Sequence, residues 1–144
     1  MNRRIARILS CTVASLAMLS AHAEPLRPDH PMVGAWKITM PGGSCQEIYR
    51  IRSDGTTLVT SGEEVSESEF VISDQPSAKG FYKWVDTIKK DNGKTDCLGE
   101  ITQVGQKATN YILLHPTGDG FLICEKEDID TCVGPFLRLK GSDA

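Results

Sequence analysis

Hydrophobic and polar positions alternate with a period of two along most of the chain after residue 24. At the start of this region, Trp36, Ile38 and Met40 alternate with the polar residues Lys37 and Thr39. Gly, Pro, Asn and Asp residues interrupt the alternation at short intervals. A period of two places successive side chains on opposite faces of a strand, and closely spaced turns are typical of all-β domains. The pattern therefore predicts a domain built from short antiparallel strands.

The alternation and the turn residues together define most of the predicted strands. These strands cover residues 36–40, 45–52, 56–60, 70–73, 81–88, 101–104, 108–115, 121–124 and 136–140. After residue 24, no stretch that is long enough for a helix has the ~3.6-residue period of an amphipathic helix. Closing a sheet on itself removes its exposed edges. We therefore predict an all-β fold, a single antiparallel up-and-down barrel or barrel-like sheet of eight or nine strands.

One acidic segment fits two interpretations. Residues 63–69 read Glu-Glu-Val-Ser-Glu-Ser-Glu and fit either an edge strand or a solvated loop. The glutamates Glu63, Glu64, Glu67 and Glu69 fit an acidic docking surface for a basic partner. They also fit charges that keep an edge strand from aggregating, which is the favoured interpretation.

The first 23 residues have the three features of a secretory signal peptide. Arg3, Arg4 and Arg7 make its start positive, residues 8–19 are apolar, and Ala21-His22-Ala23 ends it with small residues. The apolar stretch is shorter than the ~20 residues that span a bilayer. We therefore predict a signal peptide over residues 1–23 and a mature domain over 24–144. The predicted localisation is periplasmic or secreted, with no stable membrane anchor after cleavage.

Two other export signals fit the first residues less well. Cys11 resembles a lipoprotein attachment site, but too little apolar sequence precedes it. The Arg3-Arg4 pair resembles a twin-arginine signal, but the residues that follow fit such a signal poorly. Cleavage after Ala23 by the general export route is therefore the prediction.

The charge of the mature domain excludes one class of partner. Residues 1–23 contain three arginines and no acidic residue, so their removal changes the net charge from −3 to −6. The Lys89-Lys90 pair is followed directly by Asp91, and no basic cluster stands elsewhere in the domain. Binding to nucleic acid needs concentrated Lys and Arg. We therefore expect no nucleic-acid partner.

The four cysteines of the mature domain predict two disulfides. They are Cys45, Cys97, Cys124 and Cys132, an even number that in an oxidising compartment allows three connectivities. In an up-and-down barrel successive turns alternate between the two ends, which places Cys45 and Cys97 at the same end. Cys124 and Cys132 flank a single connection. We therefore predict the pairs Cys45–Cys97 and Cys124–Cys132; the absence of CxxC spacing argues against a zinc or redox centre.

Two short motifs carry a resemblance to a known family. Gly34-Ala35-Trp36 opens the first strand, and Arg138 lies in the last strand. In this the chain resembles the lipocalins and related calycin barrels, which begin with a Gly-x-Trp strand and pack an arginine of the final strand across the indole. The resemblance implies a structural stacking pair of Trp36 and Arg138. It also implies carriage of a small apolar ligand.

Other candidate sites are better explained as surface features. The acidic run Glu125, Glu127, Asp128 and Asp130 lacks the ligand spacing of an EF-hand loop and fits a solvated face. His115 precedes Pro116 at a strand end, without a nucleophile motif that points to it. We therefore expect no catalytic residue, no metal site, no cofactor and no enzymatic activity.

Tyr82 and Trp84 are the candidate binding surface. They share one face of the predicted strand 81–88, where they fit either core packing or a surface for a ligand or partner. Large apolar side chains are numerous enough to fill a small barrel. We therefore expect an exported bacterial envelope binding module that contacts a protein partner, or else a small apolar ligand. The alternative is a structural or stress-tolerance envelope protein without a ligand.

Overall fold

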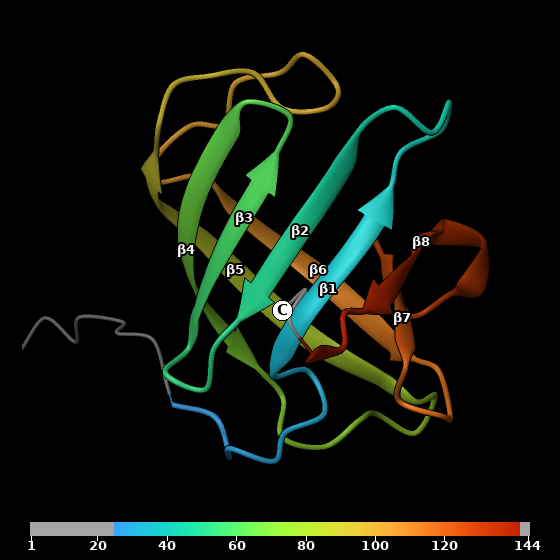
Figure 1. Ribbon diagram of the computed structural model, residues 1–144. Coiled ribbons are helices and arrows are strands. Elements are labelled where there is room, and N and C mark those ends of the chain that lie inside the picture. The colour runs from blue at the N-terminus through green and yellow to red at the C-terminus, as the bar shows by residue number, and fades with distance from the viewer. Residues whose placement is uncertain (1–24, 142–144) are drawn as a thin grey trace, which may run out of the picture.

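The computed structural model describes residues 25–141, which form one closed barrel of eight antiparallel strands (Figure 1). The strands are β1 (Gly34–Thr39), β2 (Gln46–Ile51), β3 (Thr56–Ser61), β4 (Glu64–Ile72), β5 (Phe81–Asp91), β6 (Lys107–Leu114), β7 (Gly120–Cys124) and β8 (Cys132–Arg138). Each strand pairs with the next, and β1 pairs with β8. A 3-10 turn covers Ile129–Thr131, and within the described residues no helix is long and apolar enough to span a membrane. The predicted all-β up-and-down barrel is confirmed, with eight strands.

The predicted signal peptide, residues 1–23, lies outside the described residues.

Two predicted elements differ in the structure. Residues 63–69 are neither an edge strand nor a loop, because 64–69 belong to β4, which pairs with β3 on one side and β5 on the other. Residues 101–104 form no strand. They lie in the connection between β5 and β6, where the side chains of Ile101 and Val104 are exposed. A strand-like sequence such as this one forms a strand only where a neighbouring strand is available to pair with it.

The closure between β1 and β8 is short. It consists of two residue pairs, Trp36 with Arg138 and Lys37 with Leu137, whereas β1 and β2 pair through six. Further along β8 stands Pro135, which has no backbone N–H to donate to a neighbouring strand. The β1–β8 junction therefore has fewer residue pairs than the β1–β2 pairing, with one further backbone hydrogen bond of 2.9 Å from Leu139 N to the Ala35 carbonyl.

The hydrophobic core fills the end of the barrel where the chain enters β1. Its buried members are Met32, Trp36, Ile51, Phe70, Trp84, Ile112, Phe121 and Phe136. The ring of Trp36 is fully buried, and its Nε1 donates a hydrogen bond of 2.9 Å to the Met32 carbonyl. The Arg138 guanidinium lies over this ring, with Cζ 3.9 Å from the centroid. These contacts join β1 and β8 at this end of the barrel, here named the closed end.

Both predicted disulfides are present. Cys45–Cys97 joins the end of the β1–β2 turn to the connection between β5 and β6, over a sequence separation of 52. Cys124–Cys132 closes the β7–β8 connection. Two disulfides indicate an oxidising environment outside the cytoplasm.

Candidate functional site

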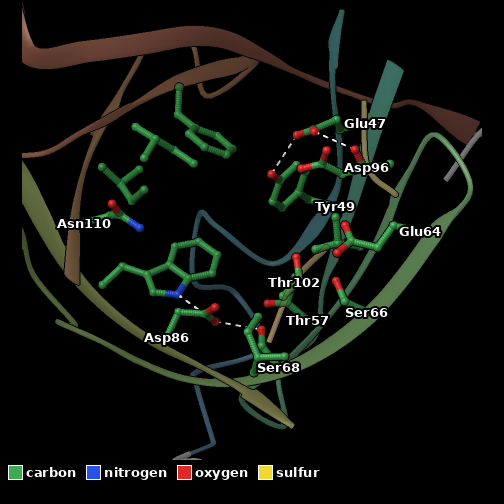
Figure 2. Close-up of a pocket in the computed structure, with 17 residues that line it drawn as sticks. Glu47, Tyr49, Thr57, Glu64, Ser66, Ser68, Asp86, Asp96, Thr102 and Asn110 are labelled. Carbon is green, nitrogen blue, oxygen red and sulfur yellow. Dashed lines mark hydrogen bonds between the residues drawn. The ribbon is translucent and has the colours of Figure 1, made fainter. Parts of the chain in front are cut away.

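The other half of the barrel interior is polar and contains a cavity of about 240 Å³. The change from an apolar to a polar interior is clearest along β4. The inward side chains of this strand are, in order from the apolar core, Phe70, Ser68, Ser66 and Glu64. Each of these residues is buried, while Val65 between them is 43% exposed. In this part of the strand, Glu64, Ser66 and Ser68 thus point into the barrel and the apolar Val65 points outside. Figure 2 shows the side chains of Glu64, Ser66 and Ser68 around the cavity.

The cavity is lined by acidic and hydroxyl side chains. The polar residues of the lining are Glu47, Tyr49, Thr57, Ser61, Glu64, Ser66, Ser68, Asp86, Asp96, Thr102 and Asn110 (Figure 2). Four of them are carboxylic acids, and no Lys, Arg or His of residues 25–141 lines the cavity. The electrostatic potential inside is therefore negative wherever these acids are ionised.

Glu47 is fixed by two neighbouring hydroxyl groups. Tyr49 Oη donates a hydrogen bond of 2.9 Å to one carboxylate oxygen, and Ser61 Oγ donates one of 2.6 Å to the other. Burial, with Glu47 acting in the same direction, raises the pKa of Tyr49 well above 10.0. Tyr49 therefore stays protonated at neutral pH and acts as a hydrogen-bond donor to Glu47.

Asp86 forms a second polar group, next to the apolar core. Its Oδ1 accepts a hydrogen bond of 2.7 Å from Ser68 Oγ and a longer one of 3.5 Å from Trp84 Nε1 (Figure 2). Burial raises the pKa of the Asp86 carboxyl, and the bonds from Ser68 and Trp84 offset this only in part. The carboxyl is held in a fixed position that faces the cavity.

Glu64 and Thr57 have polar atoms that the protein itself does not satisfy. Glu64 is 4% exposed and Thr57 is 1% exposed. Among the described residues, neither Glu64 Oε1 nor Thr57 Oγ1 has a hydrogen-bond partner, and the same holds for Asp91 Oδ2. Burial raises the pKa of Glu64 above its ordinary value of 4.5. A hydrogen bond with Thr102 lowers this pKa in part, and the neighbouring Asp91 carboxyl raises it further. Unsatisfied buried polar atoms are rare in folded proteins and call for an explanation.

The cavity is closed on one side by the connection between β5 and β6, residues 92–106, here named the covering loop. Asp96 and Thr102 of this loop belong to the cavity lining. Besides the Cys45–Cys97 disulfide, Cys97 N donates a hydrogen bond of 3.0 Å to Ser61 Oγ, the hydroxyl that also holds Glu47. The loop is therefore attached directly to a residue of the cavity wall.

The turn between β3 and β4 also fixes the covering loop. Glu63 N donates to the Thr95 carbonyl at 3.3 Å, and Asn92 Nδ2 donates to the Glu63 carbonyl at 2.9 Å. Gly62, at φ +59°, has backbone atoms of Asp96 only 3.2 Å from where a Cβ would be. A glycine is needed here because the loop backbone passes so close to the turn.

The sequence-predicted binding residues do not form one exposed surface. Trp84 is 6% exposed and lines the cavity, while Tyr82 is partly buried outside the lining. The Tyr82 ring instead packs edge-on against the buried ring of His30, with centroids 5.5 Å apart. Only Trp84 of this pair is therefore part of the cavity.

The other sequence candidates lie on the surface. His115 is exposed and its Nδ1 contacts Thr117 Oγ1 at 2.8 Å in the β6–β7 turn. Glu67 and Glu69 point outward from β4 and pair with Lys90 at 2.7 Å and Lys89 at 3.0 Å. In the described part of the chain no three His, Cys, Asp or Glu side chains are placed to hold a metal ion.

An apolar groove of about 760 Å³ lies on the outer face of the barrel. Leu113 of β6, Leu122 of β7 and Leu137 of β8 contribute to it, together with Ile129 and Pro135. The groove is distinct in character from the cavity, because apolar side chains dominate its walls.

Comparison of the chain with models of protein families, with curated proteins and with solved structures found no match. The eight-stranded antiparallel barrel is compatible with a lipocalin-like architecture.

Proposed function

We propose that this protein is an exported binding module whose barrel cavity holds one small polar ligand without transforming it. The observation that carries the proposal is the cavity of about 240 Å³ inside the barrel, with two unsatisfied buried polar atoms among its lining residues, on Glu64 and Thr57. A ligand that hydrogen-bonds to these atoms would remove the cost of burying them. The cavity is smaller than the ~300–1,000 Å³ typical of drug-sized ligands, so the ligand is small.

The polar lining favours binding over a purely structural role. An eight-stranded barrel is just wide enough to be filled by side chains or to hold one small ligand. In this barrel, apolar side chains fill one half, and short hydroxyl and acidic side chains leave the other half open. A barrel that acts only through its surface has no need of that second half. The same lining favours a polar ligand over the apolar ligand that the lipocalin resemblance implies.

The hydrogen bonds inside the cavity support binding rather than catalysis. Ser61 and Ser68 each donate to a carboxylate, Glu47 and Asp86 respectively. In this arrangement the carboxylates orient hydroxyl groups and are oriented by them, as in a site that fixes the position of a ligand.

Export of the protein is part of the proposal. The two disulfides are typical of proteins in an oxidising compartment, and residues 1–23 have the composition of a signal peptide. We place the protein in the bacterial periplasm or the medium. Membership of the lipocalin-like barrels is supported by Gly34, Trp36 and Arg138, which meet at the closed end as that family's motif implies.

A protein partner, the other ligand class considered from the sequence, would use the apolar groove on the outer face. Exposed apolar patches are typical of contact surfaces between proteins. We favour the cavity because it encloses its occupant on several sides and has unsatisfied polar atoms to bind it.

The proposal is tested with a library of small polar molecules and a variant that fills the cavity. Ser66→Leu places an apolar side chain inside, and Val65→Leu makes a comparable change on the outer face one residue away. Library members that bind should shift backbone amide resonances of β3, β4 and β5 in the wild type and in Val65→Leu, and should lose affinity at least tenfold in Ser66→Leu. Binding that persists in Ser66→Leu, or resonance shifts confined to the outer groove, would contradict the proposal.

A further inference from the structure

Carboxyl groups line the cavity at two depths. Glu64 is the first residue of β4, beside the covering loop, whereas Asp86 is bonded to Ser68, four residues further along β4 toward the apolar core. Four residues of a strand span roughly 13 Å. The cavity therefore has an acidic group near each of its ends (Figure 2).

The protein does not neutralise these acids from within the cavity. Lys89 and Lys90 of β5 are the basic residues that follow Ile88 of the cavity lining, and both point to the outer face. There they pair with Glu69 and Glu67. The charge on the inside is thus left for a bound molecule to balance.

At each of these two levels of the cavity, a buried polar atom has no hydrogen-bond partner among residues 25–141. At the covering loop this is Glu64 Oε1, next to Asp91, whose Oδ2 is likewise unsatisfied. Near Asp86 it is Thr57 Oγ1, since Thr57 lies opposite Ser68 in the β3–β4 register. Carboxylate oxygens accept hydrogen bonds, and a threonine hydroxyl accepts as well as donates. A molecule with hydrogen-bond donors at both ends would satisfy both positions.

The wall between the two depths is partly apolar. Val59 lies between Thr57 and Ser61 on β3, and its side chain lines the cavity together with those of Ile88 and Ile112. Such a wall suits methylene groups. The arrangement differs from a metal site, which needs several ligand atoms around one point.

We infer that the ligand of this cavity is a short aliphatic diamine in its doubly protonated form, with one ammonium group at Glu64 and the other at Asp86. The inference rests on the proposed function, since it names the ligand class of the same cavity. An ammonium group has three donors and no acceptor, which matches a carboxylate with free oxygens. Two such groups joined by a methylene chain match the two acidic depths and the apolar wall between them.

The test compares four probes of known composition on the exported protein. They are 1,4-diaminobutane, the neutral 1,4-butanediol of the same length, the dianion butanedioate, and calcium chloride. The diamine should shift amide resonances on β3, β4 and β5 in a saturable manner, and calorimetry should show it binding at least tenfold more tightly than each other probe. Equal or tighter binding of the diol, the dianion or calcium would overturn the inference.

Four variants locate the two ammonium groups. Glu64→Gln and Asp86→Asn each remove one negative charge with little change in shape, and each should weaken diamine binding at least tenfold. Glu63→Gln and Glu69→Gln remove charges on the outside of the barrel and should change it less than twofold. Amide spectra and thermal melts verify that every variant is folded. An unchanged affinity in Glu64→Gln, or a loss as large in Glu63→Gln, would overturn the inference.

The two proposals fail in different ways. If the diamine does not bind but another polar library member fills the cavity and is displaced by Ser66→Leu, the inference is wrong and the proposed function stands. If no polar library member binds in the cavity, both are wrong.

Discussion

The Arg138 guanidinium lies over the Trp36 indole, with Cζ 3.9 Å from the ring centroid, and both residues belong to the short β1–β8 junction. Arg138 also donates hydrogen bonds to the carbonyls of Pro31, Val33 and Gly118. Gly34 makes room for it, because a Cβ there would stand 2.7 Å from Nη1. One side chain thus joins the entry segment, the first strand and the β6–β7 turn.

Trp36→Ala should therefore destabilise the protein by roughly 3–5 kcal/mol, because it leaves a large cavity in the core. Arg138→Lys should cost less, about 1–2 kcal/mol, since an ammonium cannot stack flat on the indole or donate to three carbonyls in the same geometry. Urea denaturation of the three proteins measures both values. A wild-type midpoint for Trp36→Ala would show that the ring does not support the fold.

Glu64→Gln should stabilise the ligand-free protein at pH 7 by about 1 kcal/mol. The substitution removes a carboxylate that is buried with an unsatisfied oxygen, and such a group costs stability. A residue that lowers stability but is needed for binding is expected at a functional site. Urea midpoints of Glu64→Gln and of the surface variant Glu63→Gln test this, and a loss of stability in Glu64→Gln would contradict it.

Glu64 and Asp86 should each contribute less to the stability of the fold as the pH rises from about 4 toward neutrality. The pKa values of Glu64 and Asp86 are raised in the folded state above 4.5 and 3.8, so the folded protein holds protons that the unfolded chain has released. The stabilising effect of these protons is complete below the unfolded values and is lost as the pH rises through the folded ones. Across this range the urea midpoint of a Glu64→Gln, Asp86→Asn double variant should rise relative to that of the wild type. Parallel curves for the two proteins would refute the assignment.

The Cys45–Cys97 disulfide should stabilise both the fold and the covering loop. Replacing both cysteines by serine should cost roughly 4 kcal/mol, as expected for a closed loop of this length. Hydrogen exchange should become faster across residues 92–106. The matched control is the Cys124→Ser, Cys132→Ser variant, which should cost roughly 2.5 kcal/mol and leave exchange in the covering loop unchanged.

The mature protein should begin at Glu24. The mass of intact protein recovered from the periplasm or the medium should correspond to residues 24–144 with two disulfides. A lipid-modified Cys11 would show that the protein is anchored instead.

The alternation of hydrophobic and polar residues made the barrel predictable, because the apolar residues of β1, such as Trp36, and of β5, such as Trp84, face the core. The order of the strands then made both disulfides predictable, because successive turns alternate between the two ends of the barrel. It did not reveal the cavity. In β4 the usual rule is reversed, with Val65 exposed and Glu64, Ser66 and Ser68 inside. A segment of mostly polar residues does not show which face is buried, since both faces look soluble. The one available signal was register, as Glu64, Ser66 and Ser68 share the face of the apolar Phe70.

The Cys45–Cys97 disulfide has a topological consequence for the cavity. The chain between these cysteines, together with the S–S bond, forms a covalent ring that contains β2, β3, β4 and β5. All four acids of the cavity lining (Glu47, Glu64, Asp86 and Asp96) lie within this ring. The two-pair junction between β1 and β8 lies outside it. If the barrel opened along that junction, the four acids would therefore stay tethered in one closed loop of chain.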